Sequence, residues 1–163
     1  PPERDPMPPH ISLRDVEDND LLIFFAQQQD PEALRMAAFP SRDRDAFMTH
    51  WSKILDEETC IVRTILVGLE VAGHICSWPV AGERNIGYWL GREYWGQGIA
   101  SAALAQFLTV VTTRPLFASV AKHNLGSLRV LQKCGFQISG EDTFRYTPDS
   151  EPGEEFILTL AIP

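Results

Sequence analysis

The segment Tyr94–Ala100 carries the residues whose types and spacing point most directly to chemistry. It reads Tyr-Trp-Gly-Gln-Gly-Ile-Ala and lies between an apolar, aromatic run at 85–90 and a run with apolar residues at helical spacing. Glycines at a strand-to-helix junction let the backbone turn tightly and leave the first amide groups of the helix uncovered. Those amides and the positive end of the helix dipole can bind an anion. The segment therefore predicts a site for a phosphorylated ligand.

Two common nucleotide-binding motifs do not fit this segment. A dinucleotide fingerprint needs a third small residue, a place that Ser101 fills imperfectly, and an acidic residue after the next strand. The next expected strand, Leu116–Ala121, is followed by Lys122 and His123 instead. A nucleotide P-loop needs Gly-Lys-Ser/Thr at the end of the loop, and Ile99 follows Gly98 here. A plain tight turn without a ligand remains an alternative for the glycine pair alone.

A second segment, Ala121–Phe136, has the pattern of a capped helix. Asn124 is a favourable N-cap, and Gly135 with Phe136 is typical of a helix C-terminus. One apolar stripe is formed by Leu125, Leu128 and Leu131.

Together, three motifs resemble those of the GNAT superfamily of acetyl-CoA-dependent N-acetyltransferases, particularly the ribosomal-protein alanine N-acetyltransferases. They are the Ile-Gly-Tyr-Trp-Leu run at 86–90, the Tyr-Trp-Gly-x-Gly-x-Ala loop at 94–100, and an Asn-x-x-Ser…Lys-x-Gly-Phe segment at 124–136. The likeness extends more loosely from about Ile11 to the C-terminus. It implies an α/β fold of mixed α+β type, with a partly parallel twisted sheet flanked by helices. It also implies direct transfer of acetyl from acetyl-CoA to a primary amine.

The resemblance implies a set of cofactor-binding residues. The backbone at 97–101 would hold the CoA pyrophosphate, and the backbone of Trp89 and Leu90 would pair with the pantetheine arm and polarise the thioester. Trp95 and Asn124 would also contact CoA, although a packing role for Trp95 and a purely capping role for Asn124 stay open. The full set is Trp89, Leu90, Trp95, Gly96, Gln97, Gly98, Ile99, Ala100, Ser101, Asn124 and Ser127.

Ser127 is the predicted acid that protonates the departing CoA thiolate, because the resembling subgroup places a hydroxyl there; a surface serine is the alternative. The general base stays open. Related sequences often carry Glu where this chain has Asn85, which cannot take a proton. Glu83, His74 and Glu70 are candidates, as is a water relay. The missing carboxylate also leaves a second hypothesis, a non-catalytic acyl-CoA-binding or interaction module on the same fold.

Apolar periodicity predicts the elements that position these motifs. Helices are expected at 18–29, 43–55, from about 99, and 124–134, with 31–40 irregular or briefly helical. Leu21, Leu22, Phe24 and Phe25 are expected to face inward from the first helix. Strands are expected at 11–14, 59–67, 71–80, 86–90, 116–121, 136–139 and 156–160. Strands first in hairpins and then alternating with helices predict a mixed sheet.

The composition indicates the number of domains, the state of the cysteines and the location of the protein. With 163 residues, of which 44% are hydrophobic, we expect one domain at 10–163 behind a flexible proline-rich tail at 1–9. No apolar run approaches a membrane span, and Cys60, Cys76 and Cys134 are expected to be reduced and to bind no metal. These features favour a cytoplasmic protein, with a homodimer possible and no membrane or nucleic acid as partner.

Charge is divided unevenly along the chain. From Arg84 to Lys133 there are six basic residues and one acidic residue, whereas the net charge of the whole chain is −8. A basic cofactor side and an acidic remainder would steer CoA and a cationic amine acceptor to different sides. Surface acid that merely keeps the protein soluble is the alternative.

Overall fold

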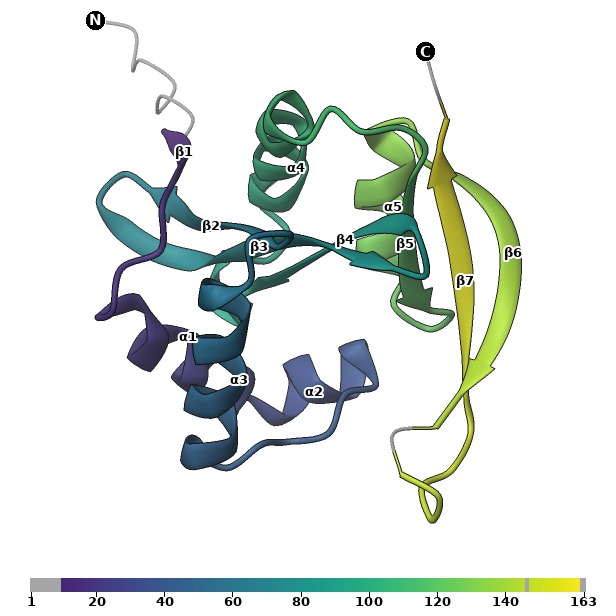
Figure 1. The fold of residues 1–163 in the computed structure, drawn as a ribbon, viewed down its shortest axis with the longest axis horizontal. Coiled ribbons are helices and arrows are strands. Elements are labelled where there is room, and N and C mark those ends of the chain that lie inside the picture. The colour runs from purple at the N-terminus through teal and green to yellow at the C-terminus, as the bar shows by residue number, and fades with distance from the viewer. Residues whose placement is uncertain (1–9, 146, 162–163) are drawn as a thin grey trace, which may run out of the picture.

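The computed structural model describes residues 10–145 and 147–161, so the tail expected at 1–9 lies outside the described residues (Figure 1). Seven strands form one sheet in the order β1-β2-β3-β4-β5-β7-β6. The strands are β1 (Ile11–Arg14), β2 (Ile61–Val67), β3 (Glu70–Val80), β4 (Glu83–Leu90), β5 (Leu116–Ala121), β6 (Gln137–Phe144) and β7 (Gly153–Leu160). The helices are α1 (Asp20–Gln28), α2 (Pro31–Ala37), α3 (Arg44–Asp56), α4 (Ile99–Val110) and α5 (Leu125–Lys133), with a 3-10 turn η1 (Arg92–Tyr94).

Helices cover both faces of the sheet (Figure 1). The larger core lies under α4 and α5, where Leu104 and Leu131 pack with Ile86, Ala118 and Leu158 from the strands. A smaller aromatic core lies under α1 and α3, built mainly from Phe24, Phe47 and Trp51. Burial of these apolar surfaces is the main force that holds the two helical layers on the sheet. The mixed, helix-flanked sheet expected from the sequence is confirmed.

The sheet is split between its two parallel strands. β4 and β5 pair only at their first residues, where Arg84 lies opposite Leu116 and Asn85 opposite Phe117. All other neighbouring strands pair antiparallel along most of their length. Beyond Asn85, β4 therefore has no partner strand on its β5 side, and its backbone is available to a ligand.

Several boundaries differ from the sequence expectations. The segment 31–40 contains α2, which begins at Pro31 behind Asp30, as suits a proline in the first turn of a helix. β6 runs on to Phe144 because it forms a long hairpin with β7, a non-local pairing that the short apolar run does not show. Leu22 was expected to face inward, but its side chain is 51% exposed, because α1 packs through Phe24 instead.

Candidate active site

Two adjoining cavities lie where β4 and β5 diverge. The first has a volume of about 310 Å³ and runs from the glycine loop to α5, and α2 forms another wall. Ten of the eleven predicted cofactor-binding residues line it. The eleventh, Gln97, turns its side chain back and donates a hydrogen bond to the Glu93 carbonyl oxygen at 2.9 Å. The second cavity has a volume of about 120 Å³ and extends into the split.

The glycine loop brings the start of α4 to the first cavity. Gly96 and Gly98 have φ angles of 73° and 76°, a left-handed conformation that glycine adopts without strain. Gly98 is the N-cap of α4 and offers no side-chain cap, so the first amides of the helix are left for another acceptor. Because Ile99, Ala100 and Ser101 line the cavity, this helix end fits the phosphate site predicted from the sequence.

The end of β4 turns polar backbone groups toward the split. Gly91 donates its N–H to the Ala72 carbonyl oxygen of β3. Backbone groups of successive strand residues point to opposite sides, so those of Leu90 and Tyr88 face away from β3. The Leu90 carbonyl oxygen accepts a hydrogen bond from the Trp95 indole at 2.9 Å. Tyr88 thus presents its backbone amide where a thioester carbonyl could be polarised.

Ser127 and Tyr88 form a hydroxyl pair at the junction of the two cavities. The Tyr88 hydroxyl donates to the Ser127 Oγ at 3.0 Å, and both residues line both cavities. Asn124, the N-cap of α5, accepts a hydrogen bond from the Ser127 amide and fixes the turn that presents the serine. Burial raises the pKa of Tyr88, so this hydroxyl keeps its proton at neutral pH.

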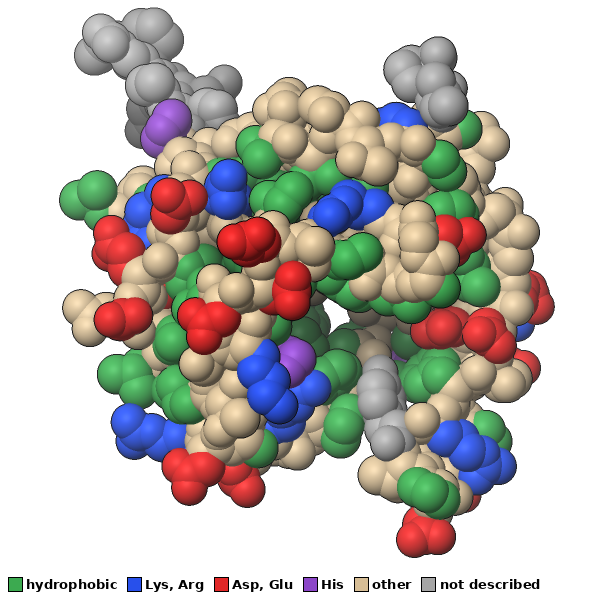
Figure 2. All heavy atoms as spheres, viewed as in Figure 1, with side chains coloured by type: hydrophobic (Ala, Val, Ile, Leu, Met, Phe, Trp, Pro, Cys, Tyr) green, Lys and Arg blue, Asp and Glu red, His purple; other side chains and the backbone are tan. Residues whose placement is uncertain are grey.

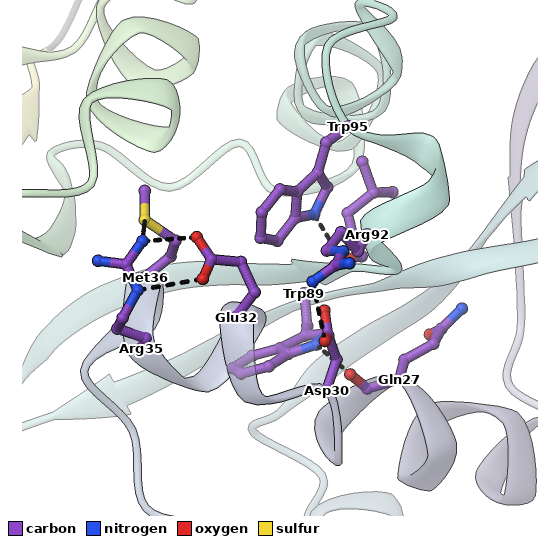
Figure 3. A network of polar contacts seen from close by, with 9 residues as sticks. Gln27, Asp30, Glu32, Arg35, Met36, Trp89, Arg92 and Trp95 are labelled. Atoms are coloured by element: carbon purple, nitrogen blue, oxygen red, sulfur yellow. Dashed lines mark hydrogen bonds and ion pairs between the residues drawn. The ribbon is translucent and has the colours of Figure 1, made fainter.

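The helix α2 covers the first cavity, and polar contacts hold both of its ends; Figure 3 shows those ahead of the helix. Ahead of the helix, the Trp89 indole donates to the Gln27 carbonyl oxygen at 3.3 Å, and Arg92 lies 3.4 Å from Asp30. At its far end, His123 Nε2 lies 2.7 Å from the Arg35 carbonyl oxygen, a link between the start of α5 and α2. These contacts place Ala33, Met36 and Ala37 over the cavity.

The candidates for a general base are not brought to either cavity. His74 is buried between Phe24 and Trp51, at ring distances of 4.8 Å and 4.7 Å, and burial together with the charge of His50 lowers its pKa to about 3. Glu83 is exposed at the β3–β4 turn, at the opposite end of β4 from Leu90. Glu70 accepts a hydrogen bond from the Tyr94 hydroxyl at the sheet surface, and Asn85 lies at the base of the split.

The sequence analysis did not single out a carboxylate pair on β7 and β6. Glu155 of β7 lies opposite Ala121 of β5 and Asp142 of β6. Ala118 and Val120 face the core under α4 and α5, so the alternation of strand side chains turns Glu155 to the other face, where α2 lies. Burial and the charge of Asp142 raise the pKa of Glu155. Figure 2 shows a hollow on this side of the molecule, with acidic side chains on its β6–β7 rim.

Within residues 10–145 and 147–161, no group of three or more His, Cys, Asp or Glu side chains is placed to hold a metal ion. Cys60, Cys76 and Cys134 carry free thiols in the structure. No helix in this part of the chain is long and apolar enough to cross a membrane.

Comparisons with known proteins agree with this geometry. A profile of the acetyltransferase (GNAT) domain matches residues 10–137. Among solved structures, spermidine N-acetyltransferase from Vibrio cholerae, in complex with CoA and spermine, superposes with a TM-score of 0.79 at 13% identity, over 93% of this chain and 95% of that one. A search of curated protein sequences finds no significant match.

Two structures that contain CoA or a CoA disulfide are also similar. RimL, a ribosomal-protein α-N-acetyltransferase in complex with CoA, gives a TM-score of 0.78 at 17% identity, covering 93% of this chain and 94% of that one. RimJ of Mycobacterium smegmatis, in complex with a CoA disulfide, gives 0.76 at 23% identity, covering 93% and 81%. At these identities the structures show a shared fold, and the domain profile shows the family. The chain therefore belongs to the acetyltransferase (GNAT) family and is an acetyl-CoA-dependent N-acetyltransferase.

Proposed function

We propose that this enzyme transfers the acetyl group at the split between β4 and β5, to a cationic primary amine that enters from the α2 side. The observation that carries the proposal is the pairing of β4 with β5 at only two positions, next to a cavity that reaches the start of α4. CoA phosphates would bind the α4 amides, and the pantetheine arm would follow β4 to Tyr88. Holding the thioester there orients it for direct attack.

The proposed chemistry uses groups around the junction of the cavities. The amine nitrogen attacks the thioester carbonyl carbon, and the Tyr88 amide stabilises the developing oxyanion. The carbon–sulfur bond then breaks, and Ser127 gives its proton to the thiolate, so that CoA leaves as a thiol. The nitrogen loses a proton to solvent as the amide forms. Ser127 recovers its proton from the Tyr88 hydroxyl, which in turn takes a proton from solvent.

We assign the acceptor as a cation because of the carboxylates on the face of the sheet where α2 lies. Glu155 is half-buried there, and no ion pair of its side chain occurs among the described residues. An ammonium beside Glu155 and Asp142 would relieve the repulsion between the two carboxylates. A carboxylate with a raised pKa also suits the removal of a proton from the ammonium before attack. A cytoplasmic location and a homodimer remain predictions.

A panel of amines tests this proposal. CoA thiol release is measured with a polyamine, an aminoglycoside, a basic peptide and a neutral primary amine, each at low and high salt. We expect kcat/KM for the cationic amines to fall steeply as salt rises, because screening shortens the field of the carboxylates. A preferred acceptor that is neutral or anionic, with salt-independent kinetics, would overturn the assignment of a cationic acceptor.

Two neighbouring glutamates give a matched pair of variants. Glu155→Gln removes the carboxylate on the α2 side, and we expect kcat/KM for a cationic amine to fall about tenfold or more. Glu154→Gln is the control, because Glu154 lies on the other face beside Lys122. Equal effects of the two substitutions would show that Glu155 has no particular role. If neither acetyl-CoA binding nor turnover is found with any amine, the proposed function itself fails.

A further inference from the structure

The second cavity has an apolar inner wall. It shares Ala37, Tyr88, Asn124 and Ser127 with the first cavity, so the two spaces meet at the hydroxyl pair. Its inner wall is built from five side chains of the main core: Ile86, Leu104, Ala118, Val120 and Leu131. The opening toward α2 is lined by Gly87, Ser119 and Ala121, whose small size leaves a path for the amine.

We propose that this second cavity is an acyl pocket, and that the enzyme also uses short unbranched acyl-CoA donors longer than acetyl, namely propionyl-CoA and butyryl-CoA. This inference rests on the proposed function, because it places the thioester sulfur beside Ser127 at the junction. From that point the acyl chain runs inward onto the apolar wall, while the amine approaches from the α2 side.

The size of the cavity exceeds what an acetyl group needs. A cavity of about 150 Å³ with an apolar lining holds a benzene molecule. The second cavity has about 120 Å³, whereas an acetyl group places a single methyl beyond the carbonyl. The remaining space accommodates roughly two further carbons, and each methylene buried there favours binding by about fourfold.

The polarity of the wall sets the chemical class of the acyl group. No described residue that lines the second cavity carries a charge. A succinyl or malonyl group would bury a carboxylate without a partner, which is strongly unfavourable. The pocket therefore favours neutral alkyl chains. The reaction is unchanged: a carbon–nitrogen bond forms, the carbon–sulfur bond breaks, and CoA leaves as a thiol.

An acyl-CoA series tests the pocket in the unmodified protein. CoA release is measured for acetyl-, propionyl-, butyryl- and succinyl-CoA with one amine, and affinities are measured by calorimetry, which needs no acceptor. We expect kcat/KM for propionyl and butyryl within about tenfold of acetyl, and succinyl at least a hundredfold lower. A kcat/KM for butyryl-CoA more than tenfold below that for acetyl-CoA would overturn the proposed acyl pocket.

A substitution that fills the pocket should lower activity with the longer acyl-CoA donors more than activity with acetyl-CoA. Ala118→Val adds two methyl groups to the wall, and we expect the ratio of kcat/KM for butyryl-CoA to kcat/KM for acetyl-CoA to fall at least tenfold. Ala105→Val is the control, because this substitution adds the same two methyl groups on the solvent side of α4. Melting temperatures check that both variants fold, and the series in the unmodified protein decides if Ala118→Val does not. Turnover with acetyl-CoA but not with butyryl-CoA would contradict only the proposed acyl pocket. No turnover with any donor would contradict the proposed function.

Discussion

Between α1, α3 and the strands β2 and β3, aromatic rings fill the space, whereas small residues leave a gap between β4 and β5. Phe24, Phe47 and Trp51 are at most 2% exposed, and the Phe24 and Trp51 rings lie 5.1 Å apart. Along the split, Gly87, Ala118 and Ala121 line a cavity instead. We call the first region the closed core, defined by Phe24, Phe47, Trp51 and His74, and the second the split.

The comparison teaches how to read buried titratable groups in this fold. His74 has the most perturbed histidine pKa of the described residues, yet it lies in the closed core and lines neither of the two cavities. Ser127 and Tyr88 border the split, where a substrate has access to them. Access, created by strand divergence and small side chains, distinguishes a reaction site from a buried polar group.

The largest expected effect comes from a substitution in the closed core. Trp51→Ala leaves a large hole beside Phe24 and His74, and we expect it to lower the free energy of unfolding by about 3–5 kcal/mol. Met36→Ala is the counterpart at the first cavity, where the side chain already borders open space. For it we expect a loss of about 1 kcal/mol. Urea denaturation measures both, and equal losses would contradict the contrast between the two regions.

Next in size is the loss of the phosphate site. Gly98→Glu puts bulk and negative charge at the start of α4, and we expect acetyl-CoA affinity to fall about a hundredfold or more in calorimetry. Gly82→Glu is the matched control, because Gly82 also has a positive φ and open space around its Cα but lies in the β3–β4 turn. Both substitutions place a side chain on a residue with a positive φ. Unchanged affinity in Gly98→Glu would remove the helix end from the cofactor site.

The third prediction concerns the acid at the junction. Ser127→Ala removes the hydroxyl while Asn124 still caps the helix, so we expect kcat to fall about a hundredfold with acetyl-CoA affinity within about threefold. Ser139→Ala is the control: it breaks another hydroxyl pair, with Thr159 at 2.7 Å, on the far strands β6 and β7. If kcat of Ser127→Ala stays within twofold, the thiolate leaves without help from this residue.

A smaller effect should appear in the pH dependence of stability. The folded protein holds the pKa of His74 near 3, below the ordinary value of 6.5, so the unfolded chain binds a proton that the folded chain does not. The free energy of unfolding should therefore fall as pH is lowered from about 6.5 to 4.5, by about 1 kcal/mol per unit. His74→Phe keeps a ring between Phe24 and Trp51 and should flatten most of this slope. His50, whose pKa burial also lowers, leaves a smaller slope. The same slope in both proteins would contradict the account of His74.

The local parts of the site could be predicted from the sequence, because neighbouring residues determine them. The turn at Gly96 and Gly98, the start of α4 and the Asn124 cap each depend on spacing within a few residues. The Tyr88–Ser127 contact joins residues 39 positions apart, and Glu155 lies next to Ala121 only through the pairing of β7 with β5. Such contacts depend on sheet order and on where two strands diverge, which local periodicity does not encode.

Hydrogen exchange with and without acetyl-CoA tests most directly the claim that the split, and not the closed core, binds the substrate. We predict that acetyl-CoA slows amide exchange at 88–90, 98–101 and 124–127, because these amides become bonded to the cofactor or covered by it. Exchange in β2 and α3 should not change. Protection spread over the closed core, or absent from 88–90, would contradict the account.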